Sequence, residues 1–172
     1  VTPDTISYNA AITACGRGLQ WQRSISLLGE MRLATVSACS VTTGAAVDAC
    51  DKASAWTSAL HLVDCARKDG VEFNALVFSA AINASGKGHR WDLALDLLSL
   101  AQTLDDAVDP ITYNCAINAC RRGLQWGWSL HLFREMGCLM LQVDGMTFRA
   151  AIRACASGSQ WRLAARLQQE AV

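Results

Sequence analysis

The sequence predicts an all-α solenoid built from helix-turn-helix repeats. Five of the six tryptophans lie at one unbroken interval of 35 residues, namely Trp21, Trp56, Trp91, Trp126 and Trp161. The segments that end at these residues align without a gap: AAITACGRGLQW, AAVDACDKASAW, AAINASGKGHRW, CAINACRRGLQW and AAIRACASGSQW. A repeat of this length is typical of stacked helical hairpins, in which each unit buries its apolar face only against its neighbours.

Composition supports one elongated helical domain over residues 1–172. The chain contains only two prolines, Pro3 and Pro110, and both lie next to the predicted start of a repeat. Fifteen basic and fifteen acidic residues cancel, so net charge indicates no preference for nucleic acid or an anionic membrane. No stretch approaches the ~20 apolar residues of a membrane span. Because the chain lacks an initial Met and its last repeat stops after 28 residues, we expect a piece of a longer protein.

The fourth repeat shows how each unit folds. Its first helix is predicted over Pro110–Arg121, since Pro suits a first helical position and Asp109 can cap it. Gly123 is expected to end this helix, and a second helix over Leu124–Gly137 follows. An apolar stripe along that second helix is formed by Trp126, Leu130, Leu132, Phe133 and Met136. Applied to every unit, this predicts repeats at 5–39, 40–74, 75–109, 110–144 and 145–172, with first helices near 5–16, 40–51, 75–86, 110–121 and 145–156.

Three columns of residues are assigned to packing. The invariant alanines are expected to let the first helices approach closely and to line a ligand groove; they are Ala14, Ala49, Ala84, Ala119 and Ala154. The tryptophans are expected to wedge between the helices and the adjoining repeat. Cys15, Cys50, Cys120 and Cys155 share one position, whose equivalents in stacked helices lie too far apart for a disulfide. The remaining cysteines form no CxxC, so no zinc site is expected.

The chain resembles an array of pentatricopeptide repeats. The resemblance covers the whole chain and rests on the openings TISYNAAI, LVFSAAI, PITYNCAI and GMTFRAAI and on LFREM at residues 132–136. It implies a right-handed superhelix similar to that of tetratricopeptide repeats, and binding of single-stranded RNA with one base read per repeat.

The resemblance assigns base reading to the fifth residue and the last residue of each repeat. The fifth residues are Asn9, Gly44, Ser79, Asn114 and Arg149, and the last residues are Cys39, Asn74, Asp109 and Asp144. Asn114 with Asp144 resembles a uracil-reading pair, and Ser79 with Asp109 a guanine-reading pair. Gly44 offers no side chain, and Arg149 is longer than the usual reading residue. The implied preference is pyrimidine, unassigned, guanine, uracil, read 5′ to 3′ along the chain.

Two further columns are candidates for RNA contact. The second residues of the repeats, which sandwich the base in this family, are Ile6, Val41, Leu76, Ile111 and Met146. Core packing would equally demand apolar residues at these places. The thirteenth residues are basic in four repeats: Arg17, Lys52, Lys87 and Arg122. Such a column could follow a phosphate backbone, with the acidic residues placed elsewhere, or could stabilise the helix C-termini.

The sequence indicates no catalytic site. It contains no HExxH, GxSxG or phosphate-loop motif, so we expect neither enzyme activity, a cofactor, a metal nor a small-molecule substrate. The expected partner is single-stranded RNA, with other RNA-processing proteins as possible further partners. The resemblance implies a role in RNA processing, stability, editing or translation in a mitochondrion or chloroplast. Alternatives are a helical scaffold that binds protein, and a stretch of a larger enzyme.

Overall fold

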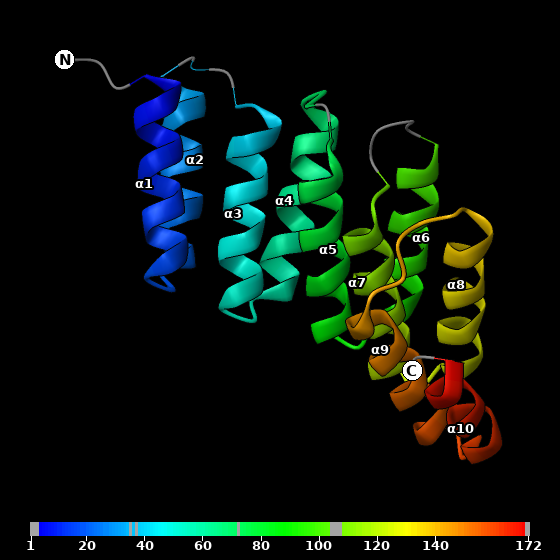
Figure 1. The fold of residues 1–172 in the computed structure, drawn as a ribbon. Coiled ribbons are helices and arrows are strands. Elements are labelled where there is room, and N and C mark those ends of the chain that lie inside the picture. The colour runs from blue at the N-terminus through cyan, green and yellow to red at the C-terminus, as the bar shows by residue number, and fades with distance from the viewer. Residues whose placement is uncertain (1–3, 35, 37, 72, 104–107, 171–172) are drawn as a thin grey trace.

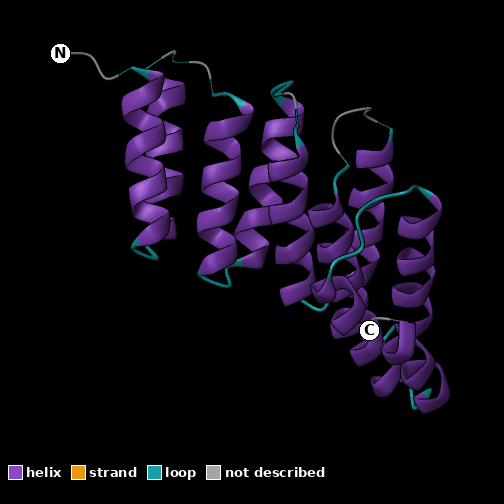
Figure 2. Cartoon of the chain, in the orientation of Figure 1, coloured by secondary structure: helices purple, strands orange, loops and turns teal. Residues whose placement is uncertain are grey.

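The fold consists of helical hairpins stacked side by side. The computed structural model describes residues 4–34, 36, 38–71, 73–103 and 108–170. The first helices of the repeats are α1 (Thr5–Arg17), α3 (Ser40–Lys52), α5 (Ala75–Lys87), α7 (Pro110–Arg122) and α9 (Gly145–Ser157). The second helices are α2 (Trp21–Leu33), α4 (Trp56–Lys68), α6 (Trp91–Gln102), α8 (Trp126–Cys138) and α10 (Trp161–Glu170). The predicted all-α class is confirmed, and no strand occurs in the described residues (Figure 2).

The two sets of helices form different layers. Each first helix packs against the first helix of the next repeat, so α1, α3, α5, α7 and α9 form a continuous layer (Figure 1). Each second helix packs against the first helix of its own repeat and, from α2 to α8, against that of the next. Within the described residues, no second helix packs against another second helix. Closer approach on the first-helix side curves the array, as expected for a solenoid.

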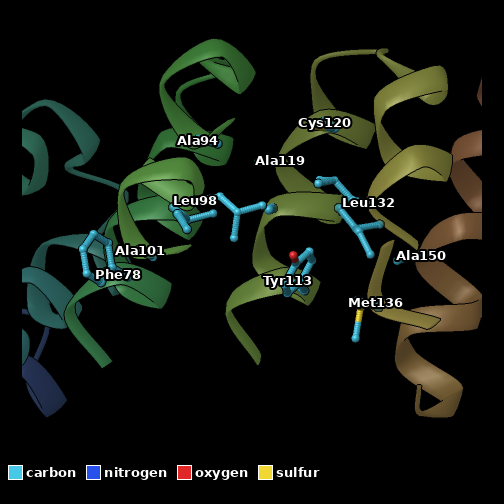
Figure 3. Packing of buried hydrophobic residues seen from close by; sticks show 13 residues of the cluster. Phe78, Ala94, Leu98, Ala101, Tyr113, Ala119, Cys120, Leu132, Met136 and Ala150 are labelled. Carbon is cyan, nitrogen blue, oxygen red and sulfur yellow. The ribbon is translucent and has the colours of Figure 1, made fainter. Parts of the chain in front are cut away.

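The core runs across repeat boundaries. One cluster joins Phe78 of α5, Leu98 of α6 and Tyr113 of α7 to Leu132 and Met136 of α8 (Figure 3). A second cluster extends from α1 to α5. The apolar stripe predicted for the fourth repeat is therefore confirmed, with Leu132 and Met136 almost fully buried. Each repeat completes its core with side chains from its neighbours.

The alanine column packs the first helices together, but it does not line a groove. Ala49, Ala84, Ala119 and Ala154 are at most 1% exposed, which contradicts the expectation that this row faces a ligand for four of its five members. Ala14, on α1, is exposed. A Cβ on Gly86 would lie 2.9 Å from the Cβ of Ala119. Backbones at this separation leave no room for a ligand between them. The surface available for binding must lie at other positions of the first helices.

The turn between the two helices of a repeat begins at the glycine, as predicted. Gly123 is the C-cap of α7, with a φ of −79° that any residue adopts, and the left-handed residue of the turn is Leu124, with a φ of 58°. The N–H of Gln125 donates to the carbonyl of Cys120 at 2.9 Å and closes the turn. The second helix consequently begins at Trp126 rather than at the predicted Leu124. The first helices each extend one residue beyond their predicted ends.

The glycines at these turns make room for tryptophan. A Cβ added to Gly88 would lie 2.5 Å from the ring of Trp56. A Cβ on Gly123 would lie 2.4 Å from the ring of Trp91, and a Cβ on Gly158 would lie 2.3 Å from the ring of Trp126. Each ring therefore rests on the turn of the following repeat, which confirms the packing role predicted for tryptophan. Trp161, in the last repeat of the chain, is 69% exposed.

Candidate nucleic-acid interface

The second residues of the repeats form an exposed apolar row. Their exposed fractions are 76% for Ile6, 53% for Val41, 52% for Leu76, 61% for Ile111 and 69% for Met146. These values exclude core packing, which was the alternative explanation for an apolar residue at this position. Large apolar side chains repeated at one place on a surface indicate a binding site.

The last residue of each repeat caps the first helix of the next repeat. The N–H of Thr112 donates to Oδ1 of Asp109 at 2.7 Å, and the N–H of Thr147 donates to Oδ1 of Asp144 at 2.8 Å. Asn74 accepts in the same way from the N–H of Val77 at 3.1 Å. The capping predicted for Asp109 is confirmed. Capping places these side chains at the beginning of the first-helix layer, one turn from the exposed apolar row.

In the fourth repeat the two predicted reading residues meet through a threonine of the fifth. The hydroxyl of Thr147 lies 2.7 Å from Oδ1 of Asp144 and 2.5 Å from Oδ1 of Asn114. Thr147 is fully buried, and the single proton of its hydroxyl is shared between the two acceptors, which keeps both side chains close together. Asn114, Thr147 and Asp144 are named the repeat-four cluster below.

The repeat-four cluster keeps Asp144 ionised. Hydrogen bonds from the hydroxyl and then the N–H of Thr147 lower the pKa of the Asp144 carboxyl, and the amide of Asn114 makes a smaller contribution in the same direction. An ionised carboxylate only accepts hydrogen bonds. The repeat-four cluster therefore presents a fixed acceptor next to an amide that can both donate and accept.

The first repeat has a related arrangement. The hydroxyl of Thr42 donates to Oδ1 of Asn9 at 2.5 Å and lies 3.4 Å from Sγ of Cys39. Asn9 and Cys39 are thus brought together, although a thiol replaces the carboxylate. Sequence reasoning missed the threonines, yet their signal is visible as the third residue of the repeats, at Thr42, Thr112 and Thr147.

The middle repeats depart from this arrangement. Ser79 donates its hydroxyl to the backbone carbonyl of Leu76 at 3.1 Å, and no hydrogen bond between described residues joins Ser79 to Asp109. Gly44 is buried, and a Cβ there would lie 3.2 Å from Cδ2 of Leu76. The side chain of Leu76 thus fills part of the space that a reading residue would occupy. Arg149 of the fifth repeat is exposed.

The basic column lies at the last residue of α1, α3, α5 and α7, but half of it is paired with acids. Nζ of Lys52 lies 2.6 Å from Oδ2 of Asp48, and Nζ of Lys87 lies 3.0 Å from Oδ2 of Asp51. The expectation that the acids lie elsewhere is therefore wrong for two of the four cations. Arg17 and Arg122 have no acidic partner among the described residues, so they carry the stronger positive potential.

No other site chemistry is found in the described residues. All eight cysteines are free thiols, and no group of His, Cys, Asp and Glu could hold a metal ion within the described ranges. None of the described helices is long and apolar enough to cross a membrane. Burial raises the pKa of Cys50 to about 11 and that of Cys120 to about 12, as suits thiols that serve packing.

Comparison with known protein families supports the register of these columns. The family model of the PPR repeat matches residues 6–34 and 111–139, which start at the second residue of the first and fourth repeats. Each of these two segments matches the pentatricopeptide repeat. No curated protein sequence matches the chain.

Solved structures of pentatricopeptide repeat proteins have the same fold. PPR10 from maize aligns over 99% of this chain and 24% of its own, with 22% identity and a TM-score of 0.76. PPR10 in complex with an 18-nt psaJ RNA element aligns over 96% of this chain and 24% of its own, with 20% identity and a TM-score of 0.79. The PPR domain of Arabidopsis thaliana protein-only RNase P 1 in complex with tRNA aligns over 94% of this chain and 86% of that domain, with 12% identity and a TM-score of 0.81. The chain thus spans about a quarter of the length of the maize protein.

Proposed function

We propose that this pentatricopeptide repeat array binds single-stranded RNA and reads one base per repeat. The observation that carries the proposal is the repeat-four cluster, in which the two assigned reading residues are held together beside the exposed Ile111 and Met146. The RNA complexes of PPR10 and of the PPR domain of protein-only RNase P 1 support RNA as the ligand. The array acts by occupying a strand, because none of its assigned residues does chemistry.

The charge of Asp144 accounts for a preference at the fourth repeat. Uracil and guanine carry an N–H group at the centre of the Watson–Crick edge, whereas cytosine and adenine carry a bare nitrogen there. A carboxylate that only accepts hydrogen bonds favours the former and repels the latter. Asn114 then completes the uracil assignment that the family resemblance implies.

The exposed apolar row provides the stacking surface. A base inserted at the fourth repeat would lie between Ile111 and Met146, the second residues of consecutive repeats, which are both more than half exposed. Covering these side chains with a base removes apolar surface from water and is independent of base identity. Affinity from this row and selectivity from the reading pairs are therefore separate contributions.

The four complete repeats differ in the selectivity we expect. Repeat four reads uracil, repeat three reads guanine through Ser79 and Asp109, and repeat one accepts a pyrimidine through Asn9 and Cys39. Reading by Ser79 requires its hydroxyl to leave the carbonyl of Leu76. Repeat two is unselective, since Gly44 has no side chain and its site is narrowed by Leu76.

The biological setting proposed for this activity is organellar. We place the protein in RNA processing, stability, editing or translation in a mitochondrion or chloroplast, on the family resemblance alone. The array itself is proposed to be non-catalytic, to need no cofactor, and to present the bound strand to other RNA-processing proteins.

A scaffold for protein binding is the second candidate. The observation that favours it is a cleft of about 630 Å³ between α4 and α6, on the second-helix side of the array. Its apolar lining includes Leu60, Leu93 and Leu97, with Asp64 and Asp96 at its polar edge. The cleft lies away from the code positions, so it would not compete with RNA for the same surface.

Selection from randomised single-stranded RNA tests the proposed function. The wild-type chain and Asn114→Ser are compared, because serine with Asp144 reproduces the residue pair of repeat three. Enrichment opposite repeat four should move from uracil to guanine, with the other positions unchanged. Asn83→Ser is the control, since it makes the same substitution on a first helix outside the code positions, and circular dichroism checks that loss of the hydrogen bond from Asn83 to Asp51 leaves the fold intact.

The outcomes separate the alternatives. Enrichment that stays at uracil in Asn114→Ser contradicts the assignment of Asn114, although RNA binding stands. A wild-type chain that enriches no RNA sequence, while remaining helical by circular dichroism, counts against RNA reading and favours the scaffold.

A further inference from the structure

Arg121 and Arg153 occupy two repeat positions that elsewhere in the array hold an acid and an amide. Between α3 and α5, Nδ2 of Asn83 donates to Oδ2 of Asp51 at 2.8 Å, and Lys87 lies close by. Two repeats further along the chain, the equivalents of Asp51 and Asn83 are Arg121 on α7 and Arg153 on α9. A neutralised hydrogen-bonded pair is thus replaced by two guanidinium groups in the same register.

Among the described residues, no acid forms an ion pair with these guanidinium groups. Partial burial, followed by the nearby charges of Arg122 and Arg153, lowers the pKa of Arg121. Nε of Arg121 donates to Oδ1 of Asn118 at a long 3.4 Å, and no ion pair between described residues includes Arg121, Arg122 or Arg153. Neighbouring cations without an anion are destabilised by mutual repulsion, and an anion bound close to them relieves it.

Charged residues are also unevenly distributed along the chain, with the positive excess in the C-terminal part. Residues 110–172 contain seven arginines and three acidic residues, whereas residues 1–109 contain eight basic and twelve acidic residues. The neutral total therefore hides a positive C-terminal part. All the cations of that part are arginines, whose planar groups can bind phosphate oxygens in pairs.

We propose that Arg121, Arg122 and Arg153, the arginine cluster, bind a phosphate of the RNA backbone next to the nucleotide read by repeat four. Arg121 and Arg153 belong neither to the code positions nor to the basic column, so the arginine cluster adds a contact that those columns do not supply. The inference rests on the proposed function, since the phosphates are those of the bound strand. It makes repeats four and five the principal electrostatic anchor of the array.

The arginine cluster should make the affinity for RNA more sensitive to salt. Each phosphate contact to a single strand contributes about 0.7 to the slope of log affinity against log salt. Loss of two contacts should lower the slope by about 1.4. Between 50 and 200 mM salt, the wild-type chain should then lose about sevenfold more affinity than a variant without Arg121 and Arg153.

The experiment compares two double variants of the whole chain by fluorescence anisotropy on one single-stranded RNA. Arg121→Gln with Arg153→Gln removes two of the three arginines of the cluster, and Arg134→Gln with Arg166→Gln is the control. The control removes two arginines from the same repeats, but they line a cleft between α8 and α10. We expect the first variant to show the reduced slope and the control to match the wild type. Thermal unfolding should show that the first variant is no less stable, because its substitutions remove like charges.

A second probe locates the contact. RNA with uncharged methylphosphonate linkages on both sides of the nucleotide opposite repeat four should bind the wild-type chain more weakly than unmodified RNA does. The loss should be smaller for the Arg121→Gln, Arg153→Gln variant, which keeps only Arg122 of the arginine cluster. Equal salt slopes for the two double variants overturn the arginine cluster and leave RNA binding intact. Failure of the wild-type chain to bind any RNA overturns the proposed function, and the arginine cluster with it.

Discussion

Gly123→Ala tests whether tryptophan packing on a neighbouring turn holds the repeats together. A Cβ at residue 123 would lie 2.4 Å from Cδ1, 2.8 Å from Cγ and 2.9 Å from Cβ of Trp91. Carbon atoms in contact normally lie ~3.5–4.0 Å apart, so the ring or the turn must move by about 1 Å. The φ of Gly123 is −79°, which suits alanine, so the contact with Trp91 is the main cost.

The magnitude follows from two opposing contributions. Overpacking of this kind costs ~1–3 kcal/mol. The change from glycine to alanine also raises the free energy of unfolding by ~0.5–1 kcal/mol, because alanine restricts the unfolded chain more than glycine does. We expect Gly123→Ala to lower the free energy of unfolding by about 1–2 kcal/mol. Ala53 occupies the equivalent position of repeat two, so repeats can accommodate this methyl group when the tryptophan opposite is placed for it.

Gly127→Ala is the matched control. Gly127 lies within α8, and a Cβ there would have nothing within 4 Å. The same substitution should therefore raise the free energy of unfolding by ~0.5–1 kcal/mol. Guanidinium unfolding followed by circular dichroism, fitted with a nearest-neighbour model of repeat stability, measures both variants.

The sign of the change in the free energy of unfolding decides whether the contact with Trp91 is responsible. If Gly123→Ala stabilises the chain as much as Gly127→Ala does, the contact between Trp91 and the turn does not hold repeats three and four together. A double variant gives a second check, since in a Trp91→Leu background Gly123→Ala should lose most of its cost. A cost that persists in that background would place the strain elsewhere.

Two further predictions concern the ends of the first helices. Asp144→Ala should destabilise α9 by ~1 kcal/mol, whereas Asp144→Asn should keep most of the cap, as measured by guanidinium unfolding; equal losses would contradict capping. Because the pKa of Asp144 is lowered in the folded state, its carboxylate stabilises the fold above the unfolded-state pKa, and this contribution should disappear as the pH falls below about 4. For the thiols, the hydrogen bond from Thr42 lowers the pKa of the exposed Cys39, so iodoacetamide should modify Cys39 well before Cys50 and Cys120 at pH 7, as read by peptide mass spectrometry. In Thr42→Val the modification of Cys39 should slow, and an unchanged rate would contradict the assigned cause.

The period of the sequence determined most of the fold. A 35-residue interval marked by Trp21 and its equivalents, together with Asp109 before Pro110, was enough to predict the helices, their order and the capping residue. These are local properties, because helix boundaries follow from caps, prolines and apolar spacing within one repeat. The error at the turn was the start of the second helix, which begins at Trp126 because Leu124, in the left-handed conformation, and Gln125 belong to the turn. The role of Gly123 depends on Trp91 in another repeat and could not be predicted from its own repeat.

Tertiary structure decided which columns face solvent. The apolar residue at the second position was consistent with core or surface until the exposed fractions of Ile6 and Ile111 excluded the core. The sequence predicted four unpaired cations in the basic column, yet Asp48 and Asp51 pair with two of them. Exposure and charge pairing depend on atoms contributed by neighbouring repeats, and Asp51 meets Lys87 across 36 residues of sequence. The sequence by itself therefore determined the repeats and their register, while only the stacking of one repeat on the next decided which side chains remain available to a ligand.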